Sequence, residues 1–138
     1  MITLILRDEH ERRVIATLMD ALRDEWGFAS SFGLDDLLNR WAAFVNDVEK
    51  GYSLMLEDYT QELAIRDSVE DLKEKLPERL RSEVEGLLQP LDQRFRFLTR
   101  TTKEPLLPVE LPVKFWWYRL PNALHGDLLE AALAEHLI

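Results

Sequence analysis

Apolar residues recur every three or four positions through most of the sequence, and this spacing constrains the fold more than any other feature. Residues at that spacing share one face of an α-helix, so each stripe predicts a helix with one buried side. One stripe predicts a helix over 8–26, with Asp8 as its N-cap and Gly27 as its stop. A second and clearer stripe predicts a helix from Leu34 to Gly51.

The helical spacing is interrupted twice in the middle of the chain. The apolar stripes on either side of 64–67 are out of phase by about half a turn, and 67–70 (DSVE) has the form of a capping box. We therefore expect a kink or a break near 64–67. Pro90 lies inside the stripe from Leu80 to Leu98. Since the stripe continues past the proline, either one helix kinks there or two helices stack end to end. Because a proline within a helix costs about 3 kcal/mol, we favour a break, with Pro90 opening a new helix.

The last third of the chain has a different character. Three of the six prolines fall within 101–113, which predicts an extended crossover rather than a helix. The β-branched and aromatic residues of 113–119 predict a short strand, and residues 1–6 are a candidate strand to pair with it. Asp127 begins a last capping box, which predicts a closing helix that continues to the C-terminus.

Four consecutive aromatic residues, Phe-Trp-Trp-Tyr, occupy 115–118 and are flanked by cations. Such a run is either buried or a contact surface. Since alternate residues of a strand face opposite sides, Phe115 and Trp117 would face one side, and Trp116 and Tyr118 the other. One pair can enter the core. The second pair then needs a cover, which is either the C-terminal helix or a partner protein.

Together these patterns predict a single domain, 1–138, of the mainly α class. We expect an irregular or orthogonal bundle of five to six helices, with a Pro-bounded extended segment or short strand at about 113–119 before the C-terminal helix. The apolar fraction of 46% suits an ordinary core. No apolar segment approaches the ~18 residues of a membrane span, no signal peptide is recognisable, and cysteine is absent. We therefore expect a soluble, cytoplasmic protein with no membrane partner.

The charge is strongly negative overall and unevenly distributed. The net charge of −9 disfavours binding to nucleic acid or to an anionic membrane. Residues 35–74 hold eleven acids and four bases, whereas residues 75–103 hold seven bases and four acids. The simpler interpretation is that oppositely charged helices pack against each other. The alternative is an acidic surface that binds a basic partner.

The sequence carries no motif for catalysis or for a cofactor. The three histidines have no metal-ligand spacing, and neither a phosphate-binding glycine loop nor a nucleophile elbow is present. Two carboxylate pairs occur, Asp35-Asp36 and Glu57-Asp58, but adjacent residues of a helix point about 100° apart and do not form a facing pair. Asp35 and Asp36 also lie near a predicted helix start, where acids are favoured for stability alone. We therefore expect no cofactor and no metal, and we favour a non-enzymatic protein without settling the question.

The leading hypothesis is a small acidic protein-interaction module that binds and neutralises or regulates a basic partner protein. Bacterial immunity proteins and antitoxins act in this way, and the analogy rests on size, charge and missing chemistry alone. The candidate contact residues are acids that would steer the partner and aromatics that would anchor it: Trp116, Tyr118, Arg119, Glu57, Asp58 and Glu62. A homodimer through the aromatic run is a related alternative.

Two further hypotheses belong to other functional classes. One is an enzyme with a carboxylate site between helices, which would be built from Asp58, Glu62, Tyr59 and Arg66. The other is a nucleic-acid-binding regulator that uses the basic stretch 94–103, where arginines alternate with aromatics. For that stretch, pairing with the acidic region 35–74 is the favoured interpretation.

Overall fold

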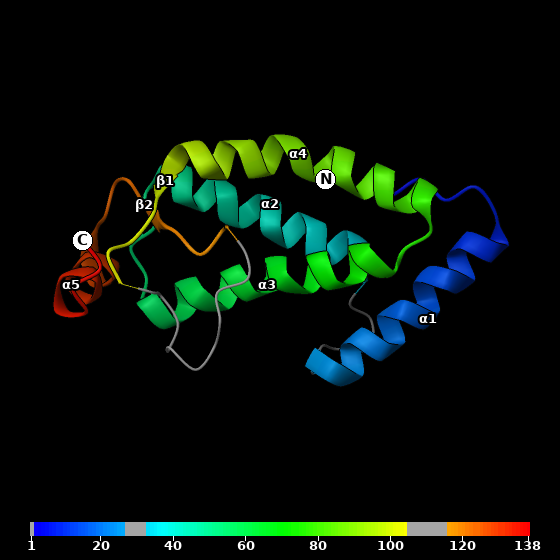
Figure 1. The fold of residues 1–138 in the computed structure, drawn as a ribbon, viewed down its shortest axis with the longest axis horizontal. Helices are drawn as coiled ribbons and strands as arrows, with labels where there is room; N and C mark the ends of the chain where they lie inside the picture. Colours follow the sequence, from blue (N-terminus) through cyan, green and yellow to red (C-terminus); the bar gives the residue numbers. More distant parts are fainter. Residues whose placement is uncertain (1, 27–32, 105–115) are drawn as a thin grey trace.

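The computed structural model describes residues 2–26, 33–104 and 116–138, and the fold in these residues is mainly helical. The elements follow in the order α1 (Glu9–Trp26), α2 (Leu34–Lys50), α3 (Leu56–Lys75), α4 (Glu78–Leu98), β1 (Thr99–Arg100), β2 (Leu120–Pro121) and α5 (Gly126–Ala134). Helices α2, α3 and α4 run along the long axis, α1 slants away at one end, and α5 lies at the other (Figure 1). The predicted helical bundle with a short strand before the last helix is confirmed.

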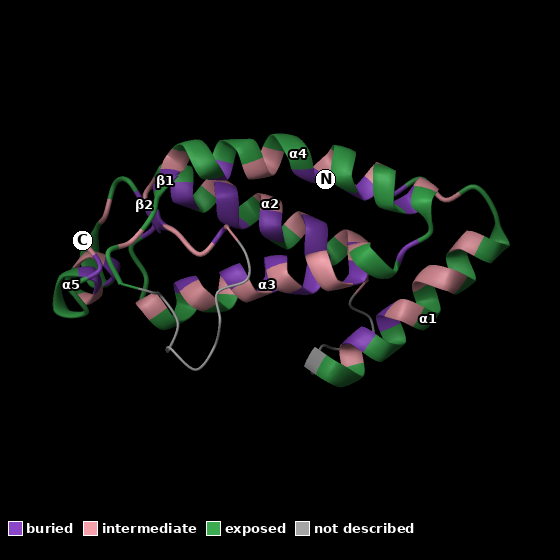
Figure 2. Cartoon of the chain, viewed as in Figure 1, coloured by how far each residue is buried: buried purple, intermediate pink, exposed green. Residues whose placement is uncertain are grey.

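The core lies where α2, α3 and α4 face one another, while much of α1 is exposed (Figure 2). The largest fully buried side chains include Trp41, Tyr59 and Phe95, one from each of these helices. Phe44 joins them, with ring centroids 5.0 Å apart for Trp41 and Phe95 and 5.3 Å apart for Phe44 and Tyr59. Tilted and edge-on aromatic contacts of this kind stabilise a core beyond their buried area.

The first two predicted helices are confirmed, while Gly27, the predicted stop of the first, lies outside the described residues. α1 begins at Glu9, and Asp8 caps it because its Oδ1 accepts the N–H of Glu11 at 2.9 Å. The Glu11 carboxylate in turn accepts the N–H of Arg7 at 2.6 Å. α2 ends where Gly51 adopts a positive φ of 108°.

Of the kink or break predicted at 64–67, the break is wrong, because α3 is one continuous helix. α3 packs against α1, α2, α4 and α5. Both apolar stripes therefore find neighbours, although they lie on different faces. The capping-box interpretation of 67–70 is wrong as well, because Asp67 lies in the middle of the helix. The buried residues of α3 spread around it accordingly: Tyr59, Leu63, Ile65, Arg66, Ser68, Val69 and Leu72.

The predicted break at Pro90 is also wrong, because α4 continues through the proline. Pro90 is exposed, and four apolar side chains of α4 are buried around it in sequence. Burying each such side chain stabilises the fold by about 1.5–3 kcal/mol, which together exceeds the ~3 kcal/mol cost of the proline. The four side chains are Leu80, Val84, Leu88 and Phe95.

The predicted strand is displaced. β1 and β2 form an antiparallel pair in which Thr99 lies opposite Pro121. Of the strand predicted at 113–119, the described part, 116–119, is a turn and irregular chain, and 113–115 lie outside the described residues. The reason is that 116–119 form side-chain hydrogen bonds to α3 and to the end of α4, and backbone pairing begins only after them.

Residues 2–6 form neither a helix nor a strand and pair with no strand in the part of the chain that the structure describes. The backbone N–H groups of Ile2 and Leu4 donate to side chains of α2, and that of Ile5 donates to a side chain of α4. These acceptors replace a neighbouring strand, so no pairing with 113–119 is formed among the described residues.

α5 is shorter than the helix predicted to reach the C-terminus. It ends at Ala134, and Leu137 beyond it is buried in the core. Asp127 lies in the first turn rather than at the cap. The crossover predicted over 101–113 lies outside the described residues from 105 onward. None of the described helices has both the length and the hydropathy needed to cross a lipid bilayer.

Candidate functional site

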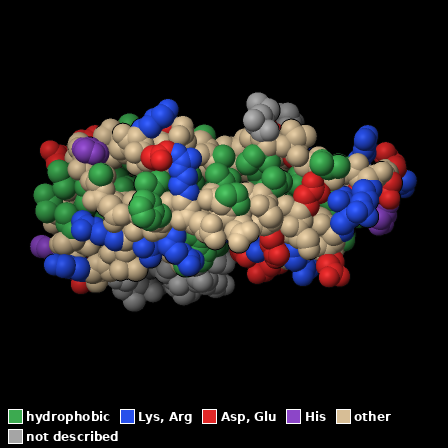
Figure 3. Space-filling model, turned by 90° about the horizontal axis from the view of Figure 1, so that it is seen from above, with side chains coloured by type: hydrophobic (Ala, Val, Ile, Leu, Met, Phe, Trp, Pro, Cys, Tyr) green, Lys and Arg blue, Asp and Glu red, His purple; other side chains and the backbone are tan. Residues whose placement is uncertain are grey.

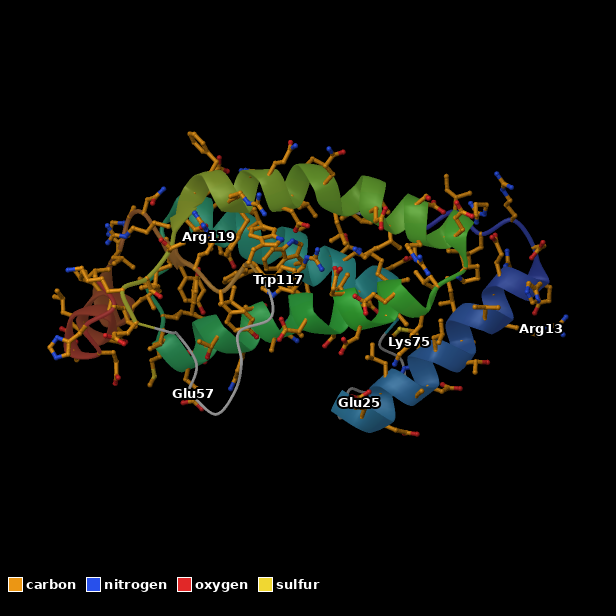
Figure 4. The ribbon with its side chains drawn as sticks, viewed as in Figure 1. Arg13, Glu25, Glu57, Lys75, Trp117 and Arg119 are labelled. Carbon is orange, nitrogen blue, oxygen red and sulfur yellow. The ribbon has the colours of Figure 1, made fainter. Side chains whose placement is uncertain are left out.

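The aromatic segment, defined here as residues 116–119, is bound to α3 through one carboxylate. Trp117 Nε1 donates to Asp67 Oδ1 at 2.7 Å, and the Tyr118 hydroxyl donates to Asp67 Oδ2 at 2.5 Å. Burial raises the pKa of Asp67, and these two hydrogen bonds oppose that rise. Figure 4 shows Trp117 between α3 and α4. The segment is thus held in place by its own side chains.

Arg119 fastens the other end of the segment. Its Nε and Nη2 donate to the hydroxyl and the carbonyl oxygen of Thr99, both at 2.9 Å. Its own carbonyl oxygen accepts the hydroxyl of Tyr59, which is fully buried. Burial raises the pKa of Tyr59 well above its ordinary value. The aromatic segment is therefore connected to α3 and to the end of α4.

Trp116 is half-buried, as are Tyr118 and Arg119, whereas Trp117 is buried. The guanidinium carbon of Arg96, on α4, lies 4.1 Å from the centre of the Trp116 ring. The alternation predicted for a strand is wrong for 116–119, because the adjacent residues Trp117 and Tyr118 both reach Asp67. The segment lies on α3 and α4, whereas the cover expected from the sequence was α5 or a partner.

A buried ionic network lies behind the aromatic segment. Arg66 is 3% exposed, and its Nε and Nη2 donate to the two oxygens of Asp92 at 3.2 and 2.9 Å. Its Nη1 donates to Glu70 at 2.9 Å, and its guanidinium lies 4.3 Å from the centre of the Trp117 ring. Trp41 Nε1 also donates to Asp92, at 3.0 Å. Bidentate geometry and the extra donor make this network a strong link between α2, α3 and α4.

The sequence reasoning missed this network. The sequence held one indication of the network: Arg66 falls beside the apolar positions of α3, and a cation that is buried there must be paired. The acceptor Asp92 lies on another helix, and no local spacing indicates that pairing.

A pocket of about 280 Å³ opens between α3 and α4, next to Trp116. We call it the α3–α4 pocket. Its lining combines two apolar residues with amides and charged groups of both signs: Arg66, Lys73, Glu85, Leu88, Gln89, Asp92, Gln93, Arg96 and Trp116.

A second surface lies at the start of α3 and the end of α2. Glu57 and Asp58 are exposed, and Figure 4 shows Glu57 pointing away from the helices. Tyr52 is buried beside this surface, and its pKa is raised to about 12 by burial and then by nearby carboxylates. Leu54 and Met55, immediately before α3, are 59% and 55% exposed. We call this group the acidic end surface: Asp47, Glu57, Asp58, Glu62, Leu54 and Met55.

The residues proposed for a carboxylate active site do not converge. Asp58 is exposed, and Glu62 pairs with Arg40 at 3.0 Å. The Tyr59 hydroxyl bonds a backbone carbonyl, and Arg66 belongs to the ionic network. The enzyme hypothesis therefore has no shared site among these four described residues.

The basic stretch 94–103 is only partly engaged. Arg94 pairs with Glu49 on α2, as the charge distribution predicts, and Arg96 stacks on Trp116. Phe97 is 82% exposed. On the face of the molecule drawn in Figure 3, several Lys and Arg side chains lie among hydrophobic ones in the half nearer α5.

Comparisons with known proteins add no relative from which a function could be transferred. No protein-family model matches the sequence, and no curated protein or solved structure is significantly similar to it. In the described ranges, no three His, Asp or Glu side chains are grouped as metal ligands. The functional argument therefore rests on the geometry above.

Proposed function

We propose that this chain is a protein-interaction module that binds a basic partner protein and neutralises or regulates it. The observation that carries the proposal is the acidic end surface, where exposed carboxylates adjoin two exposed apolar side chains. Exposed large apolar residues beside a charged rim are typical of protein contacts.

The charges of this surface support binding to a cation-rich partner. Asp47, Asp58 and Glu62 lie close enough together that all three raise the pKa of Tyr52. Glu57 and Asp58 have no ion pair among the described residues, so their charge faces solvent. Carboxylates arranged in this way accelerate the approach of a basic protein, while apolar neighbours contribute to holding it.

The aromatic residues have a more limited part in this proposal than the sequence predicted. Tyr118 and Arg119 already have internal partners, so they position the segment. Trp116 keeps a partly exposed ring and remains the aromatic candidate for contact with a partner.

A charge-reversal experiment tests the proposal. The tagged protein is used to capture partners from a native cell extract, alongside the variants Glu57→Lys/Asp58→Lys and Asp24→Lys/Glu25→Lys. The second variant is a matched control, because it reverses an adjacent, exposed acidic pair at the far end of α1. We expect one basic protein to bind the wild type and the control, and to be lost with the first variant.

Two results would count against the proposal. If both variants lose the same proteins, the binding depends on net charge alone. If neither loses any, the acidic end surface is not the contact. A Trp116→Ala variant, checked for an intact fold by circular dichroism, measures separately whether the aromatic ring contributes.

A further inference from the structure

We infer that the α3–α4 pocket binds a small organic anion: a carboxylate or phosphate monoester carried by one ring or a short apolar chain. This inference does not depend on the proposed function, because the pocket shares no residue with the acidic end surface.

The size and the walls of the pocket favour a small ligand with an apolar body. Its volume of about 280 Å³ lies just below the range of roughly 300–1,000 Å³ that is typical for ligand sites. Leu88 and Trp116 provide apolar contacts for the body of such a ligand. A single ring fits these dimensions.

Arg96 is the cation that remains able to bind an anion. Three cations line the pocket, but Arg66 is held by Asp92 and by a second carboxylate, and Lys73 is paired with Glu70 at 2.8 Å. Arg96 has no carboxylate partner among the described residues, and its guanidinium is stacked on an indole. Stacking orients the guanidinium plane, so its N–H groups remain directed outward and are preorganised for an oxyanion.

Two glutamines extend this recognition surface along α4. Gln89, Gln93 and Arg96 are four and three residues apart, so they share one helical face. In the described part of the chain, no protein group bonds either amide, so both can donate N–H groups to the oxygens of a ligand.

The acids of the pocket are engaged, which disfavours a cationic ligand. Asp92 Oδ1 accepts hydrogen bonds from Trp41 and Arg66, and its Oδ2 accepts a further one from Arg66. Glu85 lies 3.7 Å from the Lys73 amine. A ligand cation would find only Glu85, which lies beside that lysine, whereas an anion finds the donors of Arg96 and the two glutamines.

Titration with simple probes tests the inference. Benzoate and phenyl phosphate are added to the protein, and NMR follows the side-chain amides of Gln89 and Gln93 and the indole N–H of Trp116. Benzamidine is the matched control, because it has the same ring and the opposite charge. We expect saturable shifts of these signals with at least one anion and none with benzamidine.

Variants separate specific recognition from general attraction. Arg96→Gln should weaken binding about tenfold or more, and Arg96→Lys, which keeps the charge without the planar fork, should give an intermediate affinity. Arg100→Gln removes the same charge from an exposed residue outside the pocket and should bind like the wild type. Far-UV circular dichroism confirms that each variant is folded.

Three outcomes would overturn the inference: no shift with either anion up to ~10 mM, equal binding of benzamidine, or equal weakening by the Arg96 and Arg100 substitutions. A preference between the two anions identifies which oxyanion the site takes.

Discussion

Replacing Arg66 by Met should destabilise the protein more than replacing an exposed arginine by Met. Arg66 is 3% exposed, and its guanidinium gives three hydrogen bonds to Asp92 and Glu70. Met fills much of the same volume and contacts aromatic rings well, so the loss comes mainly from the carboxylates left behind. Removing one partner of a buried ion pair costs about 3–5 kcal/mol.

The expected magnitude lies at the lower end of that range. The side chains of Asp92 and Glu70 are 18% and 17% exposed, so water can partly solvate them once Arg66 is gone. Asp92 also keeps its bond from Trp41. We therefore expect a loss of about 3 kcal/mol in the free energy of unfolding, which for a domain of this size lowers Tm by roughly 10 °C.

Urea denaturation followed by far-UV circular dichroism measures the effect, with Arg40→Met as the matched control. Arg40 pairs with Glu62 across α2 and α3, but its side chain is 43% exposed, so we expect a loss of only about 0.2–1 kcal/mol. The double variant Arg66→Met/Asp92→Asn should recover part of the loss, because it removes one of the unpaired charges. If Arg66→Met is no more destabilising than Arg40→Met, the reasoning about the network is refuted.

Three further predictions follow from single groups. Burial raises the pKa of all three tyrosines, so the folded protein should show no phenolate absorbance near pH 10. Because the tyrosines of the unfolded chain ionise first, the stability of the fold should decrease as the pH rises from 10 toward 12. Ionisation of one tyrosine at its ordinary pKa in the native state would contradict this. Gly86→Ala should stabilise the protein by about 0.5–1 kcal/mol in thermal unfolding, because Gly86 is inside α4 and a Cβ there meets nothing within 4 Å. Gly51→Ala should destabilise it, because φ is 108° and a Cβ would lie 3.2 Å from a histidine ring, and an unchanged Tm would count against that reasoning.

The helices at the start of the chain could be predicted because each buries a single face. For α2, the buried residues repeat every three or four positions and Gly51 ends the helix, so local sequence and tertiary packing agree. For α3 the same reasoning failed, because a helix with neighbours on several sides has no single apolar stripe. A break predicted from a change of phase assumes that only one face can be buried.

Pro90 and Asp67 show that contacts between distant parts of the chain cannot be predicted from local sequence. The cost of a proline is local and visible, whereas the packing that outweighs it comes from residues on other helices. Asp67 has the surroundings of a helix cap, but its hydrogen-bond donors lie 50 and 51 positions further along the chain. Tyr118 and Arg119 could thus be named from the sequence as candidates, while their hydrogen-bond partners could not.

The two indole–carboxylate bonds give the protein a pair of internal reporters. Trp41 donates across the contact between α2 and α4, whereas Trp117 donates across the contact between the aromatic segment and α3. The exchange of each indole hydrogen with deuterium therefore follows the opening of a different contact. If the aromatic segment lifts while the helices stay together, one signal disappears and the other persists. The order in which these contacts open can be observed in the unmodified protein.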